Sequence, residues 1–222
     1  EEQEGYRISR KLLQLGTEQE PVKDILEFSA PIMRALTLET TMSCHVAVQS
    51  NEQLVVISRA EAPGTLSYSV RVGYRKPLIE TASGKVLFAF QPTEIKEKWL
   101  TMLEEQYSED EVKSFVAESK KVSKNGYLRA PSKFVEGVTD LSAPIMDGDT
   151  AIATLSVPYI QRRPEEVSVQ ACIEALQKAA EKIAHDRVVV DDKDAGIHAG
   201  ILRQRPRAQC ANVGSGFLPY LS

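Results

Sequence analysis

The sequence predicts an α+β domain with a central, mainly antiparallel sheet flanked by helices. Two apolar runs of strand character, 138–145 and 151–157, are joined by the turn-like Asp147-Gly148-Asp149 in a hairpin pattern. Further strand-like segments precede this hairpin, and segments with apolar residues at helical spacing surround it. Five or six strands of this kind, with helices beside them, indicate one sheet with helices packed on it.

The first part of the chain begins with a predicted helix over 21–38, which starts at Pro21. We expect Pro31 to kink or interrupt this helix, because proline lacks the backbone N–H that helical hydrogen bonding requires. Strand-like segments separated by turn-like residues follow the helix. They are 43–49, 53–60 and 66–72.

Apolar residues recur at helical spacing in segments before the hairpin and in one segment after it. The segments before it are 81–90, 93–104 and 108–121. After the hairpin, Pro164 with Glu165 and Glu166 favours a helix start, and the apolar pattern continues to Ala184. From 188 the pattern is lost, which predicts a flexible extension over 188–222. The alternative is a tail that docks on a neighbouring subunit through Phe217, Leu218 and Tyr220.

Composition excludes several classes of protein. The 222 residues, 42% of them hydrophobic, suffice for one sizeable core or for a domain with appendages. No run approaches the roughly 20 apolar residues of a membrane helix, so we expect a cytoplasmic protein. Three widely spaced cysteines, Cys44, Cys172 and Cys210, favour neither a disulfide framework nor a zinc site. We expect no metal and no cofactor. The net charge of −4 offers no footprint for nucleic acid.

Patterns of enzyme chemistry are weak. Ser83-Gly84-Lys85 resembles the end of a phosphate-binding loop, but Ile79 stands where that motif needs its first glycine and Val86 replaces its hydroxyl residue. Cys44 and His45 are neighbours on a predicted strand, so they point to opposite faces and do not form a nucleophile and base pair. We expect Cys44 in the core and His45 exposed or hydrogen-bonded.

Polar residues interrupt the two hairpin strands. Asp140, Ser142, Thr154 and Ser156 stand where a purely structural sheet more often carries aliphatic side chains. Two interpretations remain open. Either these residues lie on a solvated face of the sheet, or they are buried and bind a small polar ligand.

Motifs in both halves of the chain carry a family resemblance. VGYRKPL at 72–78 is followed by TASGKVLFA at 81–89, and GVTD at 137–140 is followed by SAP at 142–144 and LSVPY at 155–159. These motifs resemble the C-terminal, effector-binding domain of IclR-type bacterial transcription regulators. The opening residues 6–16 resemble the linker after that family's winged helix-turn-helix. The matches cover about 5–187 in the family's order and spacing.

The resemblance implies a GAF-like or profilin-like domain over 21–187, preceded by a remnant of the interdomain linker at 1–20. It implies a homodimer or tetramer that binds a small-molecule effector, a small organic acid or related metabolite, and operator DNA only through an N-terminal domain missing from this chain. It also implies no enzymatic activity. The ligand-binding residues that it implies are Ala82, Ser83, Gly84, Asp140, Ser142, Ser156 and Pro158.

Small side chains at 81–84 suit a carboxylate, because they leave backbone N–H groups open at a helix N-terminus. Ser142 and Ser156 are further donors to the same anion. Members that bind small oxo-acids tend to carry an acidic residue and a cysteine where this chain has Ala130 and Asp140. An anionic Asp140 repels a carboxylate, so the ligand either presents a hydroxyl or amine there, or Arg71 or Arg129 neutralises Asp140.

Two classes of function follow. The first is a sensor domain that shifts the equilibrium of an attached DNA-binding dimer. The second is a stand-alone GAF-like enzyme using Cys44 or Cys172, for which the sequence places no base beside either thiol.

Overall fold

The computed structural model describes residues 20–64, 67–162 and 167–203. The chain divides into two units between Val188 and Val189, and the first unit is the α+β domain that the sequence predicts. Its six-stranded sheet has the order β3-β2-β1-β6-β5-β4, with antiparallel neighbours throughout. The strands are β1 (Cys44–Ser50), β2 (Gln53–Ala60), β3 (Arg75–Pro77), β4 (Leu128–Pro131), β5 (Val138–Asp147) and β6 (Thr150–Ile160).

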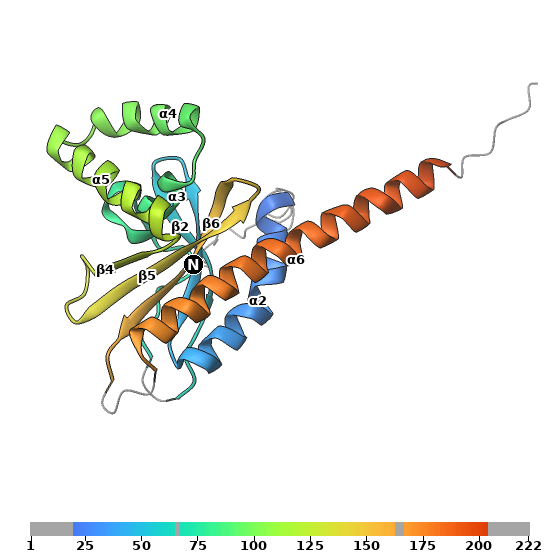
Figure 1. Cartoon of the computed structure of the whole chain (residues 1–222), viewed down its shortest axis with the longest axis horizontal. Helices are drawn as coiled ribbons and strands as arrows, with labels where there is room; N and C mark the ends of the chain where they lie inside the picture. The colour runs from blue at the N-terminus through green and yellow to red at the C-terminus, as the bar shows by residue number, and fades with distance from the viewer. Residues whose placement is uncertain (1–19, 65–66, 163–166, 204–222) are drawn as a thin grey trace, which may run out of the picture. The chain divides into compact units, whose positions relative to one another are not determined.

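Helices cover both faces of this sheet (Figure 1). On one face, α2 and the first part of α6 enclose an apolar core with β1, β5 and β6. On the other face, α3 lies against the sheet and is itself covered by α4 and α5. The helices are α2 (Glu20–Thr40), η1 (Leu78–Glu80), α3 (Ala82–Ala89), α4 (Thr93–Glu104), α5 (Glu109–Asn125) and α6 (Val169–Arg203).

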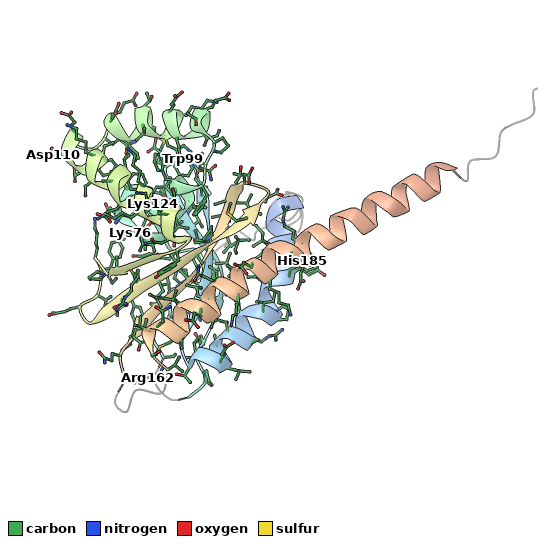
Figure 2. The ribbon with its side chains drawn as sticks, in the orientation of Figure 1. Lys76, Trp99, Asp110, Lys124, Arg162 and His185 are labelled. Atoms are coloured by element: carbon green, nitrogen blue, oxygen red, sulfur yellow. The ribbon has the colours of Figure 1, made fainter. Side chains whose placement is uncertain are left out.

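Local sequence signals explain where the helices of the second face begin and end. Ser108 and Glu111 form a capping box at the start of α5, and Gly126 ends that helix at φ 77°. Aromatic packing then fixes α4 and α5 on α3. The centroid of the Phe88 ring lies 5.0 Å from that of Phe115 and 6.1 Å from that of Trp99. Figure 2 labels Trp99 on α4.

The structure differs from the sequence prediction at 66–72. The predicted strand is absent over 67–72, and a short strand forms instead at Arg75–Pro77. The cause is a turn at 71–74, in which Gly73 has φ 83° and the Tyr74 N–H donates to the Arg71 carbonyl at 3.1 Å. Because this turn directs the chain back to β2, the preceding residues lie over the sheet rather than in it.

Two helix predictions differ from the structure in detail. Pro31 does not interrupt α2, because a proline in a helix loses one hydrogen bond without necessarily ending the helix. α6 continues past Ala184 to Arg203, and residues 185–203 contain no proline to stop it. Residues 1–19 of the linker remnant predicted at 1–20 lie outside the described residues, and so do Phe217, Leu218 and Tyr220 of the alternative docking tail.

Candidate functional site

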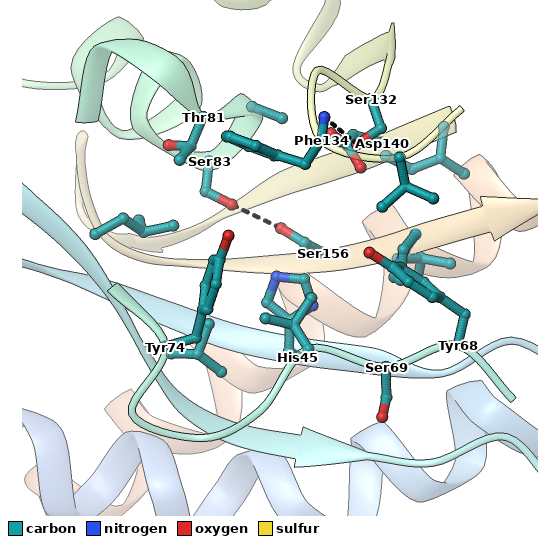
Figure 3. A pocket seen from close by; sticks show the side chains of 18 of the residues that line it. His45, Tyr68, Ser69, Tyr74, Thr81, Ser83, Ser132, Phe134, Asp140 and Ser156 are labelled. Carbon is teal, nitrogen blue, oxygen red and sulfur yellow. Dashed lines mark hydrogen bonds between the residues drawn. The ribbon is translucent and has the colours of Figure 1, made fainter. Parts of the chain in front are cut away.

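A cavity of about 410 Å³ opens on the face of the sheet that α3 covers. Strands β1, β2, β5 and β6 form its floor, and the start of α3 forms one wall. The segment 68–74, of which 68–72 belong to the strand wrongly predicted at 66–72, forms the opposite wall, and residues 132–135 close a third side (Figure 3).

Aromatic rings shape the entrance of the cavity. Tyr68 and Tyr74 come from the 68–74 wall, and Phe134 comes from the loop before β5. Tyr74 and Phe134 remain 39% and 42% exposed, so both lie at the mouth. The Lys76 ammonium lies 4.8 Å from the centroid of the Phe134 ring, a cation–π contact that positions this ring. Such a mouth suits the planar or apolar part of a ligand.

Serine hydroxyls lie at the junction of α3, β5 and β6. Ser83 and Ser156 are 2.9 Å apart, and Ser156 donates to Ser142 at 2.9 Å. Ser83 and Ser142 are 3.5 Å apart. Since these hydroxyls bond to one another, each has a hydrogen-bond partner within the protein. A ligand that bonds to Ser83 or Ser156 replaces one of these contacts.

The start of α3 is built by a cap and a close approach. The Thr81 hydroxyl accepts a hydrogen bond from the Gly84 N–H at 2.9 Å and donates to the Leu78 carbonyl at 3.2 Å. Gly84 packs against the Leu78 backbone so closely that an added methyl group would overlap the carbonyl oxygen. Gly84 therefore allows the helix N-terminus to reach the cavity, without lining the cavity itself.

Asp140 lies on β5 opposite Pro158 of β6, and both residues line the cavity. Burial raises the pKa of Asp140, while a hydrogen bond with the Ser132 side chain and the positive charge of Lys85 oppose this effect. Within the described residues, neither Arg71 nor Arg129 forms an ion pair with Asp140. The alternative in which an arginine neutralises Asp140 is therefore wrong.

His45 lies at the bottom of the cavity and contradicts the sequence expectation. We expected it to be exposed or hydrogen-bonded, yet it is 9% exposed and its Nδ1 atom is buried without a hydrogen-bond partner. Burial lowers its pKa to about 4, so the imidazole is neutral at pH 7. Its neighbour Cys44 points to the opposite face, where it packs in the apolar core as expected.

The predicted ligand-binding residues fall into two groups. The larger group lines the cavity: Ala82, Ser83, Asp140, Ser156 and Pro158. Gly84 and Ser142 lie behind it, where Gly84 supports α3 and Ser142 bonds to Ser156. Ser142 is fully buried, so it is no direct donor to a ligand in this arrangement.

Sequence reasoning missed the residues that lie opposite α3. These are His45, Tyr68, Tyr74 and Phe134. A signal existed for His45, because a polar residue facing away from the apolar face of a buried strand needs a partner there. Tyr68 carried no such signal, since its place depends on the turn at 71–74.

Other kinds of chemistry find little support. Burial raises the pKa of both Cys44 and Cys172 to about 12, which disfavours the reactive thiolate. Among the described residues, no group of His, Cys, Asp and Glu is arranged to hold a metal ion. No helix of the described ranges has the length and apolar character needed to cross a membrane.

Comparison with known proteins decides the family. Residues 21–185 match the family described as the bacterial transcriptional regulator IclR C-terminal domain. The chain belongs to this IclR family. The resemblance seen in its motifs is thereby confirmed, and so is the α+β fold.

Relatives of this IclR domain are transcription regulators. The HTH-type transcriptional regulator KdgR of Escherichia coli is 27% identical over 188 residues, which are 82% of this chain and 72% of KdgR. The Pca operon regulatory protein of Acinetobacter baylyi is 23% identical over 167 residues, 71% of this chain and 60% of that protein. The chain therefore spans only part of each relative.

Solved structures show the same fold. An IclR homologue of Microbacterium hydrocarbonoxydans, crystallised with 4-hydroxybenzoate, has a TM-score of 0.67 at 21% identity, with 82% of this chain and 76% of that chain covered. The C-terminal domain of KdgR from Escherichia coli has a TM-score of 0.60 at 23% identity, with 74% of this chain and 98% of that domain covered.

Proposed function

We propose that this IclR effector-binding domain senses a small organic acid or a related metabolite in the cavity beside α3. Effector binding then controls the DNA affinity of a winged helix-turn-helix domain N-terminal to it. The observation that carries the proposal is a cavity of about 410 Å³ in which aromatic side chains surround a few convergent polar groups. Ligand sites of proteins have this size and character.

The polar groups favour a ligand with at least one oxygen-rich end. Ser83 and Ser156 offer hydroxyls at the junction of α3 and β6, and the N-terminus of α3 carries a partial positive charge. The 4-hydroxybenzoate complex of the Microbacterium homologue is a precedent for an aromatic carboxylate in this fold.

Control of DNA binding requires two arrangements of the assembled protein with different effector affinity. The cavity walls belong to separate parts of the chain, namely the sheet, α3 and the 68–74 segment. A ligand that contacts all of them favours the arrangement in which they are closest. We propose that this change is passed on within a homodimer or tetramer.

An enzymatic alternative has no observation in its favour. A cysteine nucleophile needs a lowered thiol pKa, whereas burial raises the pKa of both described cysteines. The relatives are regulators, which supports a non-enzymatic function at the level of the family.

Calorimetry with the purified chain tests the sensor proposal. We expect 4-hydroxybenzoate, or another member of a panel of small organic acids and sugar acids, to bind with a Kd below about 1 mM. Ser156→Val should weaken this binding, whereas Thr154→Val, which removes a hydroxyl bonded to the Ala47 carbonyl outside the cavity, should not. Failure of the entire panel, or equal binding by Ser156→Val, would contradict the proposed site.

Two further measurements test the assembly and the DNA-binding part. Light scattering at about 100 μM should show at least a dimer, because interfaces of about 1,600 Å² usually survive such concentrations. The coding sequence upstream of residue 1 should add about 70 to 80 residues with helix-turn-helix patterning. A strict monomer would contradict control by subunit rearrangement.

A further inference from the structure

Among the described side chains that line the cavity, only that of His45 has a fully buried polar atom without a hydrogen-bond partner. Its Nδ1 atom has no hydrogen-bond partner, and the residue as a whole is 9% exposed. The imidazole lies between Tyr74 and Tyr68 and close to Ser156 (Figure 3). β1 and β6 place His45 directly opposite Ser156 in the sheet. The imidazole therefore forms part of the same floor as the serine hydroxyls.

A buried nitrogen without a partner is costly. Such a group typically destabilises a fold by about 1 to 3 kcal/mol relative to a bonded one. The neighbouring polar groups do not bond to Nδ1, because they have other partners. Thr81 bonds to the backbone on both sides, and Ser83 and Ser156 bond to each other. Nδ1 is itself fully buried, so a group from outside the chain bonds to it only after the imidazole turns toward the cavity.

The charges around His45 indicate what that group is. Burial alone accounts for the lowered pKa, without a contribution from a charged neighbour. The titratable and charged groups that face it are Tyr68, Tyr74, Arg71 and Asp140 around the cavity and Arg59 on β2, which pairs with Glu61 at 2.9 Å. Burial and the charge of Asp140 raise the pKa of Tyr68, so this phenol is neutral as well.

Among the described lining residues, the floor of the cavity thus carries no positive charge: beside the neutral imidazole it holds the acidic Asp140, while Arg71 is exposed where it lines the cavity. A carboxylate placed against His45 would lose its hydration beside a neutral ring, which is expensive. A hydroxyl group costs less to bury. It also suits either tautomer of a neutral imidazole, because it donates to an unprotonated nitrogen and accepts from a protonated one.

We propose that His45 selects the effector: when the ligand enters, the imidazole turns so that Nδ1 forms a hydrogen bond with a hydroxyl group of the ligand. The ligand class is that of hydroxy acids, with the hydroxyl on the floor of the cavity and the carboxylate away from it. This inference rests on the proposed sensor function and adds to it a residue that determines specificity. The cost of the unbonded nitrogen in the empty state becomes binding energy when the hydroxyl arrives.

The first test needs no ligand. His45→Phe keeps a planar ring and removes both nitrogens, so the empty domain should melt at the same temperature as wild type or a few degrees higher. His45→Asn keeps a polar group near the position of Nδ1 and serves as the conservative control. A melting temperature about 5 °C lower in His45→Phe, restored by His45→Asn, would assign the imidazole a structural hydrogen bond and overturn the proposal.

The second test uses pairs of acids that differ by a hydroxyl group. They are lactate with propionate, mandelate with phenylacetate, and para-hydroxyphenylacetate with phenylacetate. At least one hydroxy acid should bind wild type about tenfold to a hundredfold more tightly than its partner. His45→Phe should abolish this preference, and His45→Asn should retain part of it. Should His45→Phe not fold, His45→Leu takes its place in both tests.

The outcomes separate this inference from the sensor function. A preference that survives in His45→Phe, or the absence of any hydroxyl preference, overturns the role of His45. If acids without a hydroxyl bind and Ser156→Val weakens them, the sensor function stands while the ligand class proposed here is wrong. If neither these acids nor the broader panel of small organic acids and sugar acids binds, both proposals are contradicted.

Discussion

The two faces of the central sheet are buried in different ways. The face under α2 and α6 is a closed apolar core, in which Leu155 and Leu141 are fully buried. The face under α3 combines an apolar cluster around Phe88 and Phe115 with the cavity of about 410 Å³. The same strands form both faces, because successive residues of a strand point to opposite sides.

Cys44 and His45 show what this difference teaches. They are adjacent on β1, both are buried, and burial shifts the pKa of each, upward to about 12 for Cys44 and downward to about 4 for His45. The Cys44 thiol donates to the Met33 carbonyl at 3.6 Å, whereas His45 Nδ1 has no partner. Burial and a shifted pKa are thus common to core and site, and of these two residues only His45 has a buried polar atom without a partner.

The largest expected effect compares a leucine on each face. Leu155→Ala should destabilise the domain by about 2 to 5 kcal/mol, because a closed core cannot fill the space that is left. Leu54→Ala, on the cavity floor, should cost about half as much, since its side chain already borders the cavity. Urea unfolding of the two variants measures the difference. Equal losses would show that the cavity face is as closed as the core.

The second prediction concerns acid. In the unfolded chain His45 titrates near 6.5, while in the folded domain its pKa is about 4. Between these values the unfolded state binds the extra proton, so wild type loses stability as the pH falls from 7 to 4. His45→Phe lacks this loss, which amounts to about 3 kcal/mol at pH 4.

Unfolding of both proteins at pH 7 and at pH 4 checks this prediction. Asp140 shifts in the opposite direction, but it is present in both proteins and cancels in the comparison. A difference between the proteins that does not change with pH would show that the imidazole is protonated as readily in the fold as in the unfolded chain.

The smallest effects concern hydroxyl groups on β6. Ser156→Val should weaken effector binding by about 1 to 3 kcal/mol, because a ligand acceptor loses its donor. Its effect on the stability of the empty domain should be within about 1 kcal/mol, since Ser83 and Ser142 remain within reach of each other. Thr154→Val should show the reverse pattern, with a loss of stability and unchanged binding. Calorimetry and thermal unfolding of both variants separate the two patterns.

Much of the fold was predictable from local patterns. The α4 helix and the β2 strand have the predicted bounds, and the hairpin of β5 and β6 turns at Asp147-Gly148-Asp149 as expected. Each of these elements is specified by its own residues, through periodicity and turn chemistry. The strand predicted at 66–72 failed because the course of this segment is set by the turn that follows it, where the Gly73 N–H donates to the Val56 carbonyl of β2.

The candidate site was predictable only where motifs marked it. Ser83, Asp140 and Ser156 lie in segments that resemble the family signature, and all line the cavity. The position of Ser142 behind the cavity could not be predicted from its spacing, because that position depends on a hydrogen bond with the Ser156 hydroxyl on the next strand. His45 and Tyr68 belong to segments without a motif. Their place in the cavity follows from the pairing of β1 with β6 and from the course of the chain after β2.

The pairing of β1 with β6 has a consequence for motion. It joins the β3-β2-β1 half of the sheet to the β6-β5-β4 half through just His45–Ser156, Val46–Leu155 and Ala47–Thr154. These three pairs lie in the centre of the sheet, and their residues are buried between the helices of the two faces. An effector that bonds to both His45 and Ser156 links β1 to β6 at this pair and so stabilises the ladder. The sheet itself then responds to the ligand, through slower exchange at 45–47 and 154–156.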